Sequence, residues 1–151
     1  MPRSKIAKTL GAIGAAIALT AFVQSPASAA PVPKNWTTTY PTWGNAKCSA
    51  PVQLTDSRHV IIACMEYGNG YVQPYAIVMN SNADARYVPA TLLSSFSDAK
   101  CAVTSMPKNS TRICNGNIEQ APAGCNDVGG LMNYFWYEDH WMWLPVVHVC
   151  R

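Results

Sequence analysis

The 151-residue sequence lacks the compact motifs by which many enzymes are recognised. It has no Gly-x-Ser-x-Gly elbow, no His-Glu-x-x-His metal motif and no glycine-rich phosphate loop. Charged residues make up only 13% of the chain, and its cysteines form no Cys-x-x-Cys pair. Because zinc and dithiol redox sites usually need such a pair, these absences disfavour both. We therefore predict no metal, no cofactor and no catalytic residue.

The basic charge is concentrated near the N-terminus. Arg3, Lys5 and Lys8 precede an apolar run over residues 10–23, and the small residues Ala27-Ser28-Ala29 follow it. This order is typical of a secretory signal peptide. The apolar run is shorter than the roughly 20 residues that a membrane-spanning helix needs. The sequence therefore predicts a secreted, extracellular product that is free of the membrane after cleavage.

The domain division follows from this cleavage. We expect a signal peptide over residues 1–29, an extended N-terminal arm over 30–46 and a disulfide-stabilised β domain over 47–151. Loss of three basic residues with the signal leaves eight, which equals the eight acidic residues of the chain. Nucleic-acid affinity comes mainly from clustered Lys and Arg. Nucleic acid is therefore disfavoured as a partner, and we expect an extracellular protein or carbohydrate instead.

Short apolar segments that alternate with turn signals predict an all-β fold. Asn69-Gly70 is the strongest two-residue hairpin signal, and Met106–Asn109 carries proline at a preferred turn position. Pro89 has no N–H to donate, so the strand over 86–93 is expected at a sheet edge. The segment 115–130 is expected to be a loop. The pattern predicts a single antiparallel sandwich or barrel built from hairpins.

An even number of cysteines in an exported chain predicts three disulfides. If residues 55–58 and 106–109 are hairpin turns, each turn brings two cysteines opposite each other at a separation that a disulfide tolerates. Each closed loop could contribute about 3 kcal/mol. The expected pairs are Cys48–Cys64, Cys101–Cys114 and, by elimination, Cys125–Cys150.

The closing stretch 129–151 holds three of the five tryptophans and two of the three histidines. A hairpin that turns at Asp139-His140 would place Trp136 opposite Trp143. A helix over 131–144, ended by Pro145, is the alternative. The aromatic content favours the hairpin.

Side chains on a strand alternate between two faces, so the aromatic residues of this stretch cannot all face a core. One face should form an exposed strip, and exposed Trp and Tyr are typical binding anchors. The sequence thus predicts a secreted recognition domain that binds a protein or carbohydrate. A second sheet or the arm over 36–43 covering the strip is the competing interpretation. The candidate binding residues are Trp136, Tyr137, Trp141 and Trp143.

Two other functions stay open. A loop near Met106–Lys108, constrained by a disulfide, could act as an enzyme inhibitor. A small hydrolase could use a His–acid pair, either within Glu138-Asp139-His140 or at His148. A solvated turn is the favoured interpretation of the first cluster. Burial among valines is the favoured interpretation of His148, and the spacing of the three histidines, His59 included, is not diagnostic of a metal site.

Overall fold

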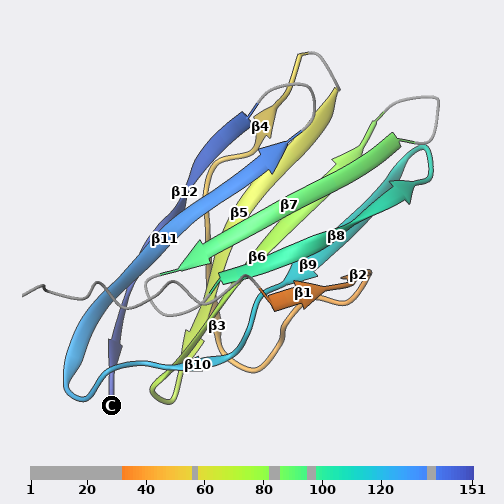
Figure 1. Cartoon of the computed structure of the whole chain (residues 1–151). Helices are drawn as coiled ribbons and strands as arrows, with labels where there is room; N and C mark the ends of the chain where they lie inside the picture. Colours follow the sequence, from red (N-terminus) through yellow and green to blue (C-terminus); the bar gives the residue numbers. More distant parts are fainter. Residues whose placement is uncertain (1–31, 56–57, 82–85, 95–97, 136–138) are drawn as a thin grey trace, which may run out of the picture.

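The structure is a computed structural model that describes residues 32–55, 58–81, 86–94, 98–135 and 139–151. The described residues form strands and no helix, arranged as two sheets packed face to face (Figure 1). The predicted all-β fold is confirmed. The strands are β1 (Val32–Lys34), β2 (Trp36–Thr37), β3 (Asn45–Cys48), β4 (Val52–Gln53), β5 (His59–Gly68), β6 (Tyr71–Asn80), β7 (Arg86–Ser94), β8 (Asp98–Met106), β9 (Ser110–Asn115), β10 (Glu119–Gln120), β11 (Cys125–Phe135) and β12 (Asp139–Cys150).

Among these described strands, one sheet has five members in the order β1-β8-β7-β11-β12. The other has the order β2-β9-β6-β5-β3, with β10 beside β6 and β4 beside β5. Neighbours pair antiparallel, except that β1 runs parallel to β8. The segment predicted as an extended arm supplies β1 to one sheet and β2 to the other, so it lies in both layers.

The hairpin predicted at Asn69-Gly70 is confirmed. Both residues have positive φ, 49° and 77°, which is the backbone of the tight turn that two-residue hairpins favour. Beyond this turn β5 and β6 pair along their full length, from Gly68 opposite Tyr71 to His59 opposite Asn80. A side chain at Gly70 would also meet Arg151, since an added Cβ lies 2.9 Å from the Arg151 Cγ atom.

The core lies between the sheets and is formed by the inward-facing residues of both. β5 contributes Ile61 and Met65, while β11 and β12 contribute Met132 and Leu144 from the opposite sheet; all four are at most 1% exposed. Burying such side chains is worth about 1.5–3 kcal/mol each. The described core is therefore large enough to hold the sheets together alongside the disulfides.

All three predicted disulfides are present. Cys48–Cys64 and Cys125–Cys150 join directly opposed residues of neighbouring strands, with Cα–Cα distances of 4.1 and 4.0 Å. Cys101–Cys114 differs, because β8 and β9 belong to different sheets and do not form the expected hairpin. The turn after Met106 carries the chain from one layer to the other. The pairing was right, but the hairpin from which it was argued was wrong.

Two further expectations were wrong. β7 lies between β8 and β11 rather than at an edge, and its ladder with β8 shifts register between Val88 and Ala90, which accommodates Pro89. The expected loop over 115–130 contains β10 and the beginning of β11. Both the interior position of β7 and the strands within 115–130 depend on pairing with strands that are distant in the sequence.

Within the described part of the chain, no helix has the length and apolarity needed to cross a bilayer. The predicted signal peptide, residues 1–29, lies outside the described residues. Three disulfides are consistent with an oxidising, extracellular environment.

Candidate functional site

The closing stretch forms a hairpin of β11 and β12, so the helical alternative is wrong. Its predicted turn was also misplaced. Phe135 pairs with Asp139, which puts the connection at residues 136–138, and Trp143 lies opposite Leu131 rather than Trp136. Trp136, Tyr137 and Glu138 fall outside the described residues. Because the turn lies earlier in the chain than Asp139-His140, every predicted cross-strand partner is displaced.

Trp141 and Trp143 project from the outer face of this hairpin. They are 54% and 76% exposed, whereas Met142 is half-buried and Leu144 is 1% exposed on the opposite face. Alternation along the strand produces this division. Neither the other sheet nor the arm buries these two rings, so the competing interpretation does not hold for this pair.

A β-bulge extends the outer face towards the end of the chain. Val128 pairs with Val147 but Gly130 pairs with Leu144, so Gly129 stands opposite two residues, Pro145 and Val146. The extra residue reverses the alternation of β12. Val146 therefore faces outward and is 55% exposed. An added Cβ at Gly129 would lie 3.1 Å from the Val146 side chain, so the bulge is closely packed.

Polar groups accompany the aromatic rings on β11. Asn133 lies opposite Trp141 and next to Thr91 of β7, and its Nδ2 donates a hydrogen bond to Asp139 Oδ1 over 3.0 Å. These residues point to the same side of the sheet because directly opposed residues share a face. We call this surface the aromatic face; it consists of Leu131, Asn133, Asp139, Trp141, Trp143 and Val146.

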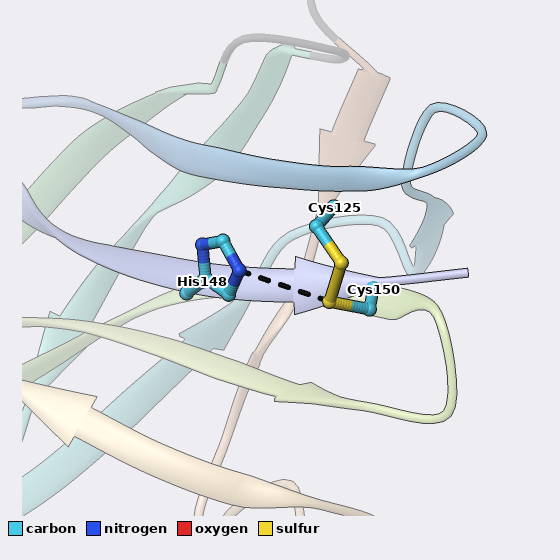
Figure 2. A group of neighbouring side chains, drawn as sticks. All are labelled: Cys125, His148 and Cys150. Atoms are coloured by element: carbon cyan, nitrogen blue, oxygen red, sulfur yellow. Dashed lines mark hydrogen bonds between the residues drawn. A yellow bond between two sulfur atoms is a disulfide. The ribbon is translucent and has the colours of Figure 1, made fainter.

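A His–acid pair lies further along the same hairpin. His148 Nδ1 is 2.8 Å from Asp127 Oδ1, and His148 Nε2 is 3.7 Å from the Cys150 sulfur (Figure 2). Both side chains are exposed, 64% for His148 and 72% for Asp127. The predicted burial of His148 was wrong, because the bulge turns it outward together with Val146.

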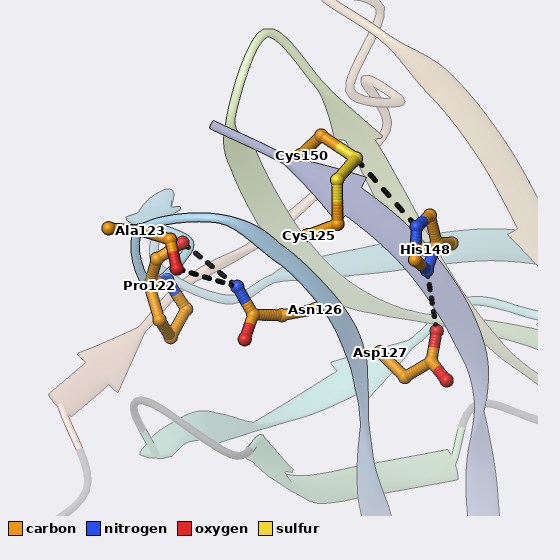
Figure 3. The surroundings of a disulfide bond; sticks show 7 residues. All are labelled: Pro122, Ala123, Cys125, Asn126, Asp127, His148 and Cys150. Carbon is orange, nitrogen blue, oxygen red and sulfur yellow. Dashed lines mark hydrogen bonds and ion pairs between the residues drawn. A yellow bond between two sulfur atoms is a disulfide. The ribbon is translucent and has the colours of Figure 1, made fainter.

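Strand register explains this cluster. Cys125 pairs with Cys150, and two residues inward Asp127 pairs with His148, on the same side of the hairpin (Figure 3). Below the disulfide, Asn126 Nδ2 donates to the carbonyl of Pro122 over 3.0 Å and closes the preceding turn. The spacing Cys-x-Asp and His-x-Cys was visible in the sequence. Combined with the predicted pairing of these cysteines, it could have located the Asp127–His148 pair.

The other candidate cluster, Glu138-Asp139-His140, is divided. Asp139 bonds to Asn133 on the outer face, while His140 is half-buried on the opposite face, opposite Tyr134. Asp139 and His140 therefore point to different sides of the sheet. The described geometry provides the His–acid contact of the hydrolase hypothesis at His148 instead.

The groups beside His148 are the two sulfur atoms of a disulfide. Ligand atoms of Cys125, His148 and Cys150 all lie within 4.8 Å of one another, yet both sulfurs belong to a disulfide. A disulfide sulfur is neither the thiolate that binds a metal nor a nucleophile for hydrolysis. In this oxidised form, one of the two sulfurs can act as the leaving group of a thiol–disulfide exchange reaction.

The loop of the inhibitor hypothesis is short and tightly held. Met106 is fully buried, and the Pro107 carbonyl accepts hydrogen bonds from Ser110 Oγ over 2.6 Å and from Asn80 Nδ2 over 3.1 Å. Lys108 is exposed at the turn. Met106 thus belongs to the core, and only the following residues are offered to solvent.

A buried polar cluster that the sequence did not indicate lies on the other sheet. Glu66 is 1% exposed, and its Oε1 accepts a hydrogen bond from the Gly44 N–H over 2.7 Å. Burial raises the pKa of the nearby Tyr75 phenol, and the negative charges of Glu66 and Tyr40 raise it further. The hydrogen bond between Gly44 and Glu66 fixes the segment before β3 against the sheet, which is a structural role.

Comparisons with protein-family models, with curated proteins and with solved structures found no match to this chain.

Proposed function

We propose that the chain is a secreted recognition domain that binds an extracellular carbohydrate through the aromatic face. The observation that carries this proposal is the exposure of Trp143 and Trp141 on one side of a hairpin, 76% and 54%. An apolar ring that large is costly to leave in water, so an exposed pair is typical of a binding surface. The small all-β domain with three disulfides is compatible with such a role.

The neighbours of the rings favour carbohydrate over protein. Sugar rings combine apolar C–H surfaces, which stack on indole, with hydroxyl groups at their edges. Asn133 and Asp139 place an amide and a carboxylate beside Trp141, already oriented by their mutual hydrogen bond. Such preorganised polar groups bind hydroxyls with little ordering cost. The tryptophans would provide affinity, and the polar pair would provide orientation.

The experiment is retention of the purified protein on insoluble polysaccharides, such as cellulose, chitin and peptidoglycan. We expect the wild type to be retained on at least one of them. Trp143→Ala should weaken binding by about 2 kcal/mol or more, as at other hot spots. Tyr71→Ala is the matched control, since Tyr71 is an exposed aromatic residue of β6, 41% exposed and away from the aromatic face.

No retention on any polysaccharide, or equal retention of wild type and Trp143→Ala, would contradict carbohydrate binding. Equal losses in Tyr71→Ala and Trp143→Ala would show that the contact is non-specific. A protein partner whose binding depends on Trp143, without polysaccharide binding, would replace the proposal.

A further inference from the structure

The Cys125–Cys150 disulfide differs from the other two in its exposure. Cys125 and Cys150 are both exposed, whereas Cys101 and Cys114 are completely buried and Cys64 is buried beside an exposed Cys48. Thiol–disulfide exchange requires an approaching thiolate to reach one of the sulfurs. On the described surface, both sulfurs of this bond belong to exposed residues.

The second difference is the histidine beside it. An ionised carboxylate can only accept hydrogen bonds, so Asp127 Oδ1 accepts a hydrogen bond from the Nδ1–H group of His148. This fixes the ring with Nε2 directed at the Cys150 sulfur, 3.7 Å away (Figure 2). When Nε2 is protonated, the imidazolium stabilises a thiolate that forms on that sulfur.

We propose that the Cys125–Cys150 bond is an exchangeable disulfide, opened by an external thiol with Cys150 as the leaving group and His148 as its acid. A thiol RSH loses its proton to His148 Nε2, and the thiolate attacks the Cys125 sulfur. The S–S bond breaks, and its electron pair passes to Cys150. The products are a mixed disulfide between R and Cys125 and a Cys150 thiolate paired with protonated His148. The co-reactant is a low-molecular-weight thiol or a cysteine of a thiol–disulfide oxidoreductase.

The surrounding structure allows this bond to open without unfolding the domain. Just beyond the disulfide, Gly124 and Arg151 exchange two backbone hydrogen bonds, N–O distances 3.2 and 3.0 Å. The ladder between β11 and β12 continues from Asn126 opposite Val149 towards the hairpin tip. The open thiols stay close together, so Cys150 can attack the mixed disulfide and restore the bond.

The experiment treats the oxidised full chain with reduced glutathione, and in a second arm with a thioredoxin-type dithiol protein. Free thiols are alkylated over time and located by peptide mapping. We expect Cys125–Cys150 to open about tenfold or more faster than the buried Cys101–Cys114, with near-ultraviolet circular dichroism unchanged. In the glutathione arm the mixed disulfide should form on Cys125 and the alkyl group on Cys150.

His148→Gln keeps a polar side chain but cannot carry the proton. It should slow opening about threefold or more and remove the preference for Cys125, while the rate at Cys101–Cys114 stays unchanged. His140→Gln, on the opposite face of β12, is the control and should behave like wild type. Opening by either thiol source in this pattern supports the proposal. Equal rates at the two disulfides in both arms, opening only on unfolding, or a His148→Gln variant with wild-type rate and site would overturn it.

Discussion

The hydroxyl of Tyr134 and the Nδ1 atom of His59 form a buried hydrogen bond between the sheets, where β11 ends in one sheet and β5 begins in the other. Both side chains are fully buried, and the rings meet edge to face, with centroids 5.9 Å apart and planes at 88°. A polar contact in this position fixes how the two sheets are aligned, because breaking it would leave polar atoms in a dry environment.

Tyr134→Phe should therefore destabilise the domain by about 1–3 kcal/mol, since the His59 nitrogen loses this bond while the ring volume is kept. Chemical denaturation measures the effect. Tyr71→Phe removes an exposed hydroxyl and should change the free energy of unfolding by less than about 0.5 kcal/mol. Equal stability of Tyr134→Phe and wild type would show that the contact does not join the sheets energetically.

Because of the β-bulge, we predict that alanine substitutions at two nearby residues have very different effects on stability. Leu144 faces the core at 1% exposure and Val146 faces solvent at 55%. Leu144→Ala should cost about 2–5 kcal/mol, because it leaves a cavity. Val146→Ala should cost less than about 0.5 kcal/mol. Thermal or chemical unfolding of both variants tests the register, and the reverse order would place the bulge elsewhere.

Gly44 is required by a close approach of two backbones. A Cβ atom added there would lie 2.5 Å from the Tyr67 carbonyl oxygen, so Gly44→Ala must displace the segment and weaken its bond to Glu66. We expect a loss of about 1–3 kcal/mol in unfolding experiments. Gly68→Ala serves as the control, since a Cβ atom added there would lie at an ordinary 3.5 Å from the Gly44 Cα atom. Similar stability of the two variants would contradict the expectation.

The raised pKa of Tyr75 leads us to predict that the stability of the domain depends on pH in the alkaline range. Burial, followed by the charges of Glu66 and Tyr40, raises its pKa above the ordinary 10.0. The folded protein then holds this proton more tightly than the unfolded chain, so the free energy of unfolding falls as pH rises above 10.0. Tyr75→Phe removes this contribution. Unfolding of both proteins from about pH 9 to about pH 11 should show a shallower decline in the variant; parallel curves would contradict it.

Local signals in the sequence predicted the features that depend on local chemistry. Asn69-Gly70 located a hairpin because its backbone requirements are satisfied within two residues. The cysteine pair Cys48–Cys64 followed from counting residues on either side of a predicted turn, and Cys125–Cys150 followed by elimination; both pairs lie on directly opposed positions. The exposure of Trp141 and Trp143 agrees with alternation along a strand, although their role in binding stays a prediction.

Features that depend on distant partners could not be predicted in this way. β7, which contains Pro89, lies inside its sheet because β11, nearly forty residues later, pairs with the side of β7 that β8 does not occupy. His148 is exposed because Gly129 on another strand faces two residues of β12. No pattern within 145–149 records that mismatch. The Asp127–His148 pair is different, because it lies two residues from the predicted Cys125–Cys150 pair on each strand, before the bulge, and that spacing could have located it.

The edge of the five-stranded sheet has consequences for the protein at high concentration. β12 is one of the two terminal strands in the order β1-β8-β7-β11-β12, and a long terminal strand is a template on which further copies can polymerise. Here Pro145 has no N–H to offer, and Lys47 Nζ donates to the Val146 carbonyl over 2.9 Å. The ammonium group occupies an acceptor that an incoming strand would need, and it brings a charge to the edge. Next to the exposed indole of Trp143, the edge of β12 is therefore a poor template for an added strand at Pro145 and Val146.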